Sequence, residues 1–409
     1  MRDCPDLDPV GHAFLTWQRA CAQAGWRPQL GTERVGVADA VGRVTAAPVH
    51  ARWSSPAYEV AAMDGIAVLA TDTTAASETS PLLLTPERFD PVDTGDPLSP
   101  GRDAVVMREH VQYQDDGAAR LVAPVTAGRH VRRIGEDVRA GEPLLPAGHR
   151  LRAVDVAVVA AAGHVDLTVW EKPVVAVLPT GDEVRPIGSV IGRGEVLDTN
   201  SLMLAAHARE AGCATVVLPV ERDDPSRIAA AVHGIAAQAD LVVIIAGTSA
   251  GRGDHTGTVL AELGQVAVRG VAMRPGHPVV LGLLHLTRPV PAIGVPGYPV
   301  SAAHVFETFA LPLIGLLLGT PTDKRPTVRA RLTQAVSSPP GIDEHIRVRL
   351  TRVNELSGDR GGYAAIPVGK GAGALSSLMR ANGLLRIPAG SSGHELGAEV
   401  VVELLRGAP

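Results

Sequence analysis

Residues 174–183 read Val-Val-Ala-Val-Leu-Pro-Thr-Gly-Asp-Glu, a continuous apolar run that ends abruptly in turn-forming residues. Five apolar residues without polar alternation are typical of a strand buried on both faces, as in a parallel sheet covered by helices. Similar runs recur at 241–245 and 291–295, with helix-forming segments between them. Strands and helices that alternate in this way predict a three-layer α/β domain with a parallel sheet, which we assign to residues 171–322.

Capping residues predict where the helices of this domain begin. A helix is expected from about Ser201, with Asn200 or Ser201 as its N-cap. Asp224-Pro225 is typical of an N-cap followed by a first-turn proline, so a second helix should begin there. A long apolar helix at 300–318 closes the domain, and we expect Ser301 to cap it.

The chain on either side of this domain has a different texture. Residues 1–170 contain many turn residues and short strand-like runs such as 104–107, with helices expected at 12–24 and 154–162. Residues 323–409 alternate between polar and apolar positions, which predicts a small β-barrel or sandwich. The expected strands of this last part are 327–332, 344–353, 364–368 and 399–405.

Composition excludes several classes of protein. A net charge of −5 over 409 residues and only four each of Trp, Tyr and Phe argue against a nucleic-acid binder. Cys4, Cys21 and Cys213 form no CxxC pair, so neither a disulfide framework nor a zinc site is predicted. Apolar stretches such as 311–318 are shorter than the roughly 20 residues that span a bilayer. We therefore expect a cytoplasmic protein without membrane or nucleic-acid partners.

The loops that follow the expected strands are the first place to look for a binding site. In parallel α/β sheets, ligands bind beyond the carboxyl ends of the strands. These loops carry Gly-rich backbone, carboxylates and two candidate cations, Arg274 and His277. Five loops should gather at this edge of the sheet: 179–183, 222–224, 247–256, 274–278 and 294–299.

The loop 247–256 is the most informative of the five. Small residues let backbone amides approach an anion, and the following helix directs its N-terminus to the same place. Asp254 is a candidate Mg²⁺ ligand, because that ion favours one or two carboxylates together with phosphate oxygens. A tight turn with Asp254 or Thr256 as a helix cap explains the same residues equally well. The anion-binding candidates in this loop are Gly247, Thr248, Ser249 and Gly251.

Carboxylates occur at other positions where a turn or cap is the alternative interpretation. Asp182 and Glu183 follow the first buried strand, and Asp223 precedes the expected cap at Asp224. In the N-terminal region, Asp64 lies in Met-Asp-Gly and Asp137 in Gly-Glu-Asp, either of which could form an ordinary turn. The residues alone leave a functional and a structural role open at each position.

Taken in order along the chain, seven segments resemble the molybdopterin molybdenumtransferase family, which includes MoeA and the E domain of gephyrin. Each motif is weak alone, but together they cover nearly the whole chain. The segments are Ala62-Met63-Asp64-Gly65-Ile66-Ala67-Val68, Gly135-Glu136-Asp137, Pro179-Thr180-Gly181-Asp182-Glu183-Val184, Asp198-Thr199-Asn200-Ser201, Met273-Arg274-Pro275-Gly276-His277-Pro278, Val295-Pro296-Gly297-Tyr298-Pro299-Val300-Ser301 and Ala381-Asn382-Gly383-Leu384.

The resemblance implies a fold and a reaction. Residues 1–170 would form two interleaved domains, one extended and one β-rich. Residues 171–322 would form the α/β molybdopterin-binding domain, and 323–409 a β-barrel. The protein would form a homodimer, as members of the family do, with an active site that lies across the subunit interface. Its reaction takes adenylylated molybdopterin and molybdate and inserts the molybdenum at the dithiolene, with Mg²⁺-dependent release of AMP. A molybdopterin adenylyltransferase and apo-molybdoenzymes are further partners consistent with this chemistry.

The resemblance also assigns roles to residues. Asp64 and Asp137 would act across the dimer on a site that includes Glu183, Asp223 and Asp254, the last three being the candidate metal ligands. The cofactor-binding residues would be Thr180, Gly181, Asp182, Gly247, Thr248, Ser249, Gly251, Arg274, His277, Pro296, Pro299 and Ser301.

Several positions depart from the family pattern. Arg274 and His277 stand in place of two lysines, and Tyr298 in place of an asparagine. Arginine changes the geometry of a cationic site, and histidine is largely neutral at pH 7. These changes leave open a preference for tungstate over molybdate, or a non-catalytic scaffold that binds cofactor without turnover. A molybdopterin adenylyltransferase is the nearest enzymatic alternative, because it shares the α/β domain.

Overall fold

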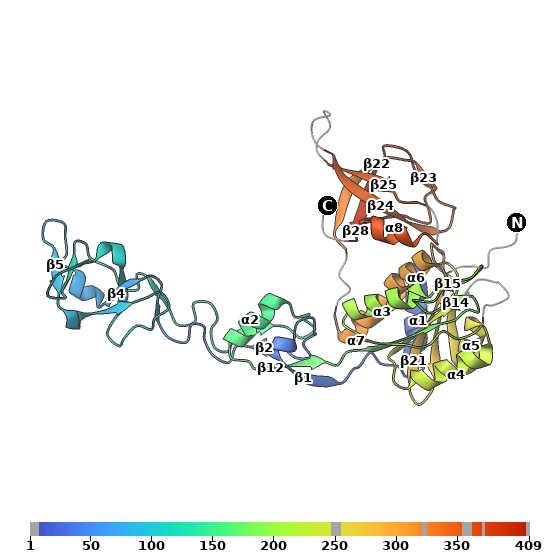
Figure 1. Cartoon of the computed structure of the whole chain (residues 1–409), viewed down its shortest axis with the longest axis horizontal. Helices are drawn as coiled ribbons and strands as arrows, with labels where there is room; N and C mark the ends of the chain where they lie inside the picture. The colour runs from blue at the N-terminus through green and yellow to red at the C-terminus, as the bar shows by residue number, and fades with distance from the viewer. Residues whose placement is uncertain (1–7, 247–254, 321–324, 354–361, 370–372, 406–409) are drawn as a thin grey trace. The chain divides into compact units, whose positions relative to one another are not determined.

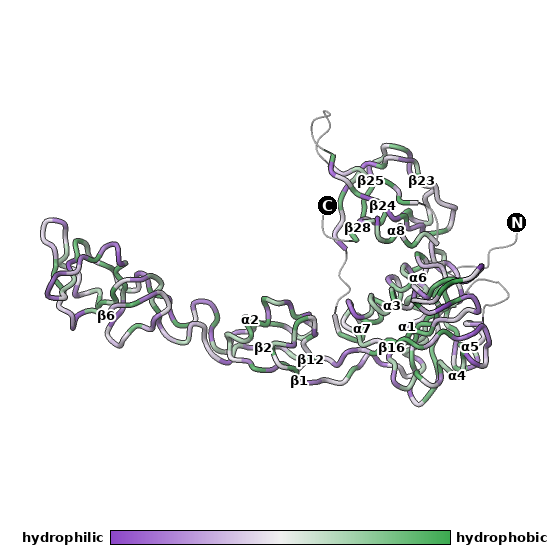
Figure 2. The backbone as a smooth tube through the Cα atoms, viewed as in Figure 1, coloured by the Kyte–Doolittle hydropathy of each residue, from purple (hydrophilic) through white to green (hydrophobic). Residues whose placement is uncertain are grey.

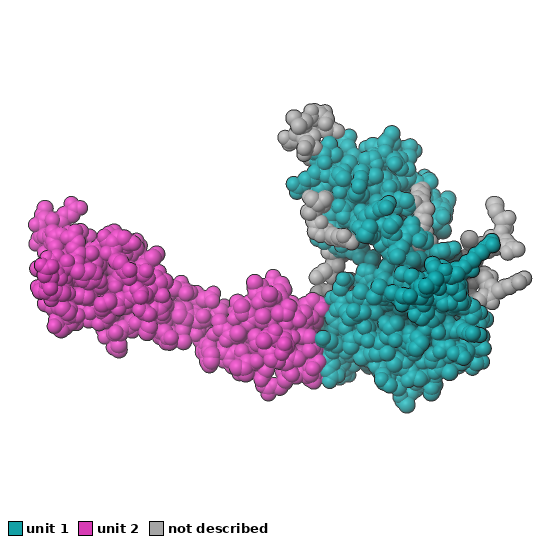
Figure 3. Space-filling view, viewed as in Figure 1, with its two compact units in different colours: residues 1–31, 171–409 teal, residues 32–170 magenta. Residues whose placement is uncertain are grey.

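A computed structural model describes residues 8–246, 255–320, 325–353, 362–369 and 373–405. The chain divides into two compact units, shown in separate colours in Figure 3. Residues 32–170 form one unit, and residues 1–31 together with 171–409 form the other, larger unit.

The α/β part of the larger unit is built on a six-stranded sheet. The strand order is β16 (Ala214–Val217), β13 (Val174–Pro179), β17 (Leu241–Ala246), β21 (Pro289–Pro296), β20 (Val280–His285), β18 (Gly264–Arg269). The first four strands are parallel, as predicted, whereas β20 runs antiparallel to both of its neighbours, β21 and the edge strand β18. Every residue of β17 is buried, which explains its unbroken apolar sequence.

Helices cover this sheet, and the middle of the α/β part is predominantly hydrophobic (Figures 1 and 2). The helices are α1 (Val10–Gln23), α3 (Thr199–Glu210), α4 (Pro225–Ala236), α5 (Thr256–Leu263), α6 (Pro299–Val305) and α7 (Leu311–Leu318). The helices α4 and α5 contact each other, as do α3 and α6. The Trp17 indole of α1 donates to Gly282 O at 2.6 Å, so α1 packs with this sheet although the sequence grouped it with residues 1–170.

The apolar helix predicted at 300–318 is continuous from Pro299 to Leu318 and contains a π turn at Phe306–Ala310. Its 20 residues are long and apolar enough to cross a membrane. However, 72% of the most apolar window is buried within the structure. This burial explains its composition as that of a core helix.

The caps differ from the prediction at two of three helices. The helix α3 begins two residues earlier than expected, and its cap is Asp198, whose Oδ1 accepts from Ser201 N at 3.0 Å. Asp224 caps α4 as predicted, accepting from Ser226 N at 2.8 Å and Arg227 N at 3.1 Å. The helix α6 has no side-chain cap, because Pro299 starts it and Ser301 already lies inside its first turn.

The C-terminal part is a closed five-stranded barrel, with β24 paired to both β25 and β26. Its strands are β22 (Thr327–Leu332), β24 (Asp343–Val353), β25 (Gly362–Pro367), β26 (Gly383–Ile387) and β28 (Glu399–Leu404). Beside the barrel lie α8 (Leu375–Arg380) and the short pair β23 (Val336–Ser337) and β27 (Gly393–His394). From the α/β part, β19 (Met273–Arg274) pairs in parallel with the start of β24.

Two of the four apolar cores in the unit 32–170 are larger than the others. One is formed by the ends of the unit: β1 (Thr32–Gly36), β2 (Val49–His50), β11 (Pro143–Leu145), α2 (Ala153–Ala161) and β12 (Asp166–Trp170). The middle forms the other, with β4 (Gly65–Val68), β5 (Leu82–Leu84), β6 (Phe89–Val92), β7 (Ala104–Met107), β8 (Gln112–Tyr113) and β9 (Ala119–Leu121). Between these parts, β3 (Val60–Ala61) pairs with β10 (Val131–Arg132).

Candidate functional site

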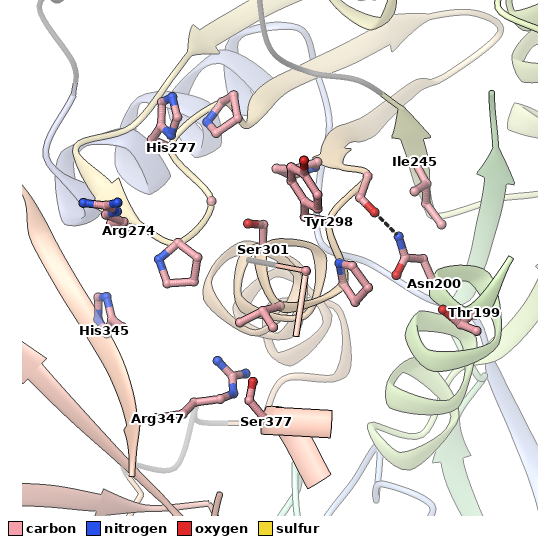
Figure 4. A pocket seen from close by; sticks show the side chains of 18 of the residues that line it. Thr199, Asn200, Ile245, Arg274, His277, Tyr298, Ser301, His345, Arg347 and Ser377 are labelled. Atoms are coloured by element: carbon pink, nitrogen blue, oxygen red, sulfur yellow. Dashed lines mark hydrogen bonds between the residues drawn. The ribbon is translucent and has the colours of Figure 1, made fainter. Parts of the chain in front are cut away.

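A cavity of about 1150 Å³ lies in the larger unit, lined by loops of the α/β part and by residues of the barrel part (Figure 4). It brings together seven of the residues that the sequence singled out: Thr180, Glu183, Arg274, His277, Pro296, Pro299 and Ser301. The barrel part contributes Ser338, Glu344, His345, Arg347 and Ser377.

Two glycines allow the loops around this cavity to turn. Gly181 has φ +145°, and a Cβ there would lie 2.6 Å from Val184 Cγ2. Gly276 has φ +104°, and a Cβ there would lie 2.8 Å from Val305 Cγ2. Any larger residue would push these loops out of place. The hydroxyl of Thr180 donates to Ile245 O at 3.1 Å and so holds the loop to β17, which leaves its oxygen only as an acceptor toward a ligand.

The start of the long helix at Pro299 forms one wall of the cavity. Ser301 lies there in the first turn and lines the cavity (Figure 4). Asn200 Nδ2 donates to Gly297 O at 2.7 Å, which ties α3 to the loop before the helix. The free N–H groups of a helix N-terminus and its macrodipole favour an anion.

Both basic and acidic side chains line the cavity: Arg274, His277, His345 and Arg347 together with Glu183, Asp198 and Glu344. Arg274 is exposed and lies at the register position beside Glu344. Burial, and then the charge of Arg274, lower the pKa of His277, so His277 is neutral at pH 7. The side chain of Arg347 is only 5% exposed, and its Nε and Nη1 have no partner among the described residues. Its nearest carboxylate oxygen, Glu307 Oε1, lies 3.8 Å from Nη2.

The sequence did not single out Arg347 as a site residue. Arg347 and Arg349 alternate along a strand, which favours one solvated face. In the structure Arg349 is exposed but Arg347 is buried, because both faces of the first half of β24 are covered. The signal available in the sequence was the charged run Asp343-Glu344-His345 directly before it, an unusual start for a strand with an ordinary solvent face.

A second cluster consists of carboxylates at the ends of β13 and β16. Burial raises the pKa of Asp223, and the negative charges of Glu183 and Asp182 raise it further. The backbone N–H of Asp182 and the nearby His255 oppose this shift. Asp223 is half-buried, whereas Asp182 and Glu183 are exposed. Carboxylates that repel one another in this way are donors that suit a divalent cation.

No group of three or more His, Cys, Asp or Glu side chains suited to a metal ion occurs among the residues that the structure describes. The predicted ligand Asp254 lies outside them, as do Gly247, Thr248, Ser249 and Gly251. Glu183 and Asp223 therefore supply only part of the predicted metal site, and the loop 247–254 would have to complete it.

The other two predicted carboxylates belong to the unit 32–170. Asp64 is exposed and accepts from Thr94 N at 2.7 Å and Thr94 Oγ1 at 2.8 Å. These bonds, and then Arg108, lower the pKa of Asp64 and hold it ionised. Asp137 is also exposed, with its backbone N–H donating to Ser55 O at 3.1 Å. Their proposed action on the other carboxylates stays a prediction.

Family comparisons match nearly the whole chain. Residues 15–163 match the MoeA N-terminal region, described as domain I and II. Residues 176–315 match the "probable molybdopterin binding domain", and 329–405 match the MoeA C-terminal region, described as domain IV.

Individual proteins show the same likeness. Molybdopterin molybdenumtransferase 2 of Mycobacterium tuberculosis H37Rv is 33% identical over 380 residues, covering 87% of this chain and 90% of the relative. Molybdopterin molybdenumtransferase of Haemophilus influenzae is 30% identical, covering 72% and 75%. Among solved structures, the molybdopterin biosynthesis MoeA protein of Pyrococcus horikoshii matches with a TM-score of 0.81 at 30% identity, covering 98% of this chain and 100% of that one.

Proposed function

The chain belongs to the molybdopterin molybdenumtransferase family, an enzyme family of molybdenum cofactor biosynthesis, and from this premise we propose its reaction in detail. The enzyme takes adenylylated molybdopterin and molybdate, inserts the molybdenum at the dithiolene and releases AMP in a Mg²⁺-dependent step. The observation that supports this proposal most strongly is the position of Glu183. It lines the oxyanion cavity and also belongs to the carboxylate cluster around Asp223, so the two sites adjoin.

The cavity supplies what a tetrahedral dianion needs. Arg347 offers two guanidinium nitrogens that have no partner in the part of the chain that the structure describes, in a buried position where a charge-assisted hydrogen bond is strong. Ser301 and the helix N-terminus at Pro299 add neutral donors. Arg274 adds a second charge at the rim, and neutral His277 can donate one hydrogen bond. Donors from both the α/β part and the barrel part would thus surround the molybdate.

The carboxylate cluster would hold the metal. Asp223 and Glu183, with Asp254, are the residues that we assign to Mg²⁺, and the raised pKa of Asp223 supports a cation there. Bound Mg²⁺ would neutralise the charge that develops on the phosphoanhydride when AMP leaves. Asp182 and the loop 247–251 would position the phosphate end of the pterin substrate, with backbone amides and hydroxyls as donors.

A second copy of the chain would complete the site. We assign Asp64 and Asp137 to the partner subunit's contribution, on the basis of the family resemblance. The bonds from Thr94 that keep Asp64 ionised and fixed support a role in positioning a cation or a donor group.

The test supplies purified full-length protein with adenylylated molybdopterin, Mg²⁺ and either molybdate or tungstate, and follows AMP and metal-loaded cofactor. We expect turnover that depends on Mg²⁺ and is lost in Asp254→Ala, and the preferred anion would reveal the effect of Arg274 and His277. Tight binding of the pterin without AMP release from either anion would contradict the enzymatic proposal and leave a cofactor-binding scaffold.

A further inference from the structure

Two histidine rings lie against each other beside the oxyanion cavity. His304 of α6 and His345 of β24 have ring centroids 4.3 Å apart and planes inclined by 48°. His304 is only 3% exposed, and His345 lines the cavity, at the left of Figure 4. Both ring nitrogens of His304 and Nδ1 of His345 lack a hydrogen-bond partner among the described residues. Apolar side chains of similar size would fill this space without leaving buried polar atoms unpaired.

The charged groups around the pair come from several segments. On the barrel side, Arg386 of β26 donates to Asp343 of β24 at 2.9 Å. On the helix side, Arg325 donates to Glu307 at 3.0 Å. Within each of these two ion pairs the charges cancel. Arg347 of β24 is left as an additional cation, because its Nη2 lies 3.8 Å from Glu307 and Glu307 is already paired with Arg325. At the cavity wall, Glu344 is buried and its Oε2 has no partner among the described residues, whereas its register neighbour Arg274 is exposed. Together these groups are four arginines and three carboxylates. The surplus charge near the two rings is therefore positive.

This environment keeps both rings neutral while the cavity is empty. Burial and then Arg386 lower the pKa of His345 to about 4. Burial lowers the pKa of His304 as well, and His345, Arg347 and Arg325 lower it further. A dianion that binds to Arg347 would reverse the sign of the surplus charge, because it adds two negative charges where one positive charge was left.

We propose that His304 and His345 form a proton-binding pair, so that the cavity takes up one proton together with a dianionic tetrahedral oxyanion. The proposal deepens the oxyanion role given above and rests on it. One proton is taken up and not two, since two imidazolium rings at 4.3 Å would repel each other strongly. The proton comes from solvent and binds at an unpartnered ring nitrogen of the pair, without any covalent step.

The pair would make the cavity selective for charge as well as for shape. A monoanion of the same shape would only cancel Arg347, so it would not draw a proton onto the rings. For a dianion, affinity should rise as the pH falls, by up to about tenfold per pH unit while one proton is taken up. Perrhenate is the matched probe, because it has the tetrahedral shape of tungstate but a single charge.

Isothermal titration calorimetry of the full chain tests this. Molybdate, tungstate and perrhenate are each titrated at micromolar concentration, between about pH 6 and pH 8, in two buffers that differ in ionisation enthalpy. The difference in measured heat gives the number of protons taken up. We expect uptake approaching one proton for molybdate and tungstate near pH 6, and none for perrhenate. His345→Phe and His304→Leu should abolish the uptake and flatten the pH dependence of affinity.

His277→Gln is the matched control, because His277 lines the same cavity but lies outside the pair. This variant should bind the anion more weakly and leave the number of protons taken up on binding unchanged. Proton uptake that persists in His345→Phe and His304→Leu but disappears in His277→Gln would contradict the proton-binding pair. Anion binding by the wild type without proton uptake would contradict it as well. His304→Asn replaces His304→Leu if the latter does not unfold cooperatively. No anion binding by the folded wild-type chain would instead contradict the oxyanion cavity itself.

Discussion

Ionised Asp223 lowers the stability of the folded chain, although we assign the same carboxylate to the metal site. Its pKa is raised by burial and by Glu183 and Asp182, so ionising it is harder in the folded than in the unfolded chain. The stability that a protonated Asp223 allows is therefore lost as the pH rises from the unfolded-state value of about 3.9 through the folded value. A bound cation would offset this loss.

Asp223→Asn should consequently stabilise the metal-free protein while it reduces activity. At neutral pH and without Mg²⁺ we expect a higher melting temperature than that of the wild type, with the gain vanishing below about pH 4. Mg²⁺-dependent AMP release should fall at least about tenfold, the order of loss typical of damaged metal sites. Thermal unfolding as a function of pH, with and without Mg²⁺, checks both effects. A variant that is destabilised at neutral pH or keeps full activity would contradict the assignment.

Arg347 gives a second prediction at this scale, with Arg325 as its control. Both guanidinium groups approach Glu307, at 3.8 Å for Arg347 and 3.0 Å for Arg325. Arg347→Leu should weaken molybdate binding by roughly tenfold to a hundredfold, the worth of one or two charge-assisted hydrogen bonds. The free energy of unfolding of this variant should change little, because Glu307 still forms its ion pair with Arg325.

Arg325→Leu should show the opposite pattern, with a clear loss of stability and a small effect on the anion. Equilibrium unfolding in urea and calorimetric titration of both variants separate the two effects. Equal losses of anion affinity in both would mean that Arg347 does not contact the anion.

At the scale of elements, Asp224 is the structural neighbour of Asp223. It caps α4 through two backbone hydrogen bonds of 2.8 and 3.1 Å. Asp224→Ala should cost about 1 kcal/mol of stability, as for other N-caps, and leave the Mg²⁺ dependence of AMP release unchanged. Chemical denaturation and the AMP assay check this. A large loss of activity in Asp224→Ala would place a site role on Asp224 and weaken the distinction from Asp223.

The elements also show what the sequence could predict. The buried runs of β13 and β17, the cap at Asp224 and the alternation of β28 are local patterns, and the structure confirms all three. The antiparallel edge of the sheet was not predictable, because the continuous apolar sequences of β20 and β21 do not indicate in which direction each strand runs. Likewise, the cap of α3 was misplaced, since Asp198 and Ser201 are both good cap formers.

The candidate site was predictable only in part. The rule for strand ends indicated Arg274 and His277, and the family resemblance indicated Ser301. All three line one cavity, and their roles there stay a prediction. It could not indicate Arg347 or the ring pair of His304 and His345, because these become site residues only through contact between the α/β part and the barrel. Tertiary burial of a charged strand segment leaves no periodic signal in the sequence.

At the scale of the whole molecule, the family assignment removes one alternative. The nearest enzymatic alternative, molybdopterin adenylyltransferase, shares only the α/β domain. This chain instead matches the MoeA family in its N-terminal region, its molybdopterin-binding domain and its C-terminal region. The scaffold and tungstate alternatives concern the chemistry of Arg274 and His277, and they are decided by activity.

Subunit complementation tests whether two chains build one site. Asp64→Asn and Asp223→Asn lie in different units, and each should be nearly inactive. If the site combines Asp64 of one chain with Asp223 of another, subunit exchange in an equal mixture should restore about a quarter of the wild-type activity, from the intact site in each mixed dimer. Analytical ultracentrifugation establishes the dimer. Mixtures that stay inactive although the chains exchange would place both carboxylates in the site of one chain.

In the reaction that we propose for this chain, release of AMP is coupled to insertion of molybdenum. The most direct measurement is a single turnover with enzyme in excess over adenylylated molybdopterin, in which AMP and molybdenum-loaded cofactor are quantified together. We predict that the two products appear at the same rate and in equal amounts, only with Mg²⁺ and an oxyanion present, and that Asp223→Asn loses both. AMP that forms without molybdenum incorporation, or a bound pterin that stays adenylylated, would contradict the account.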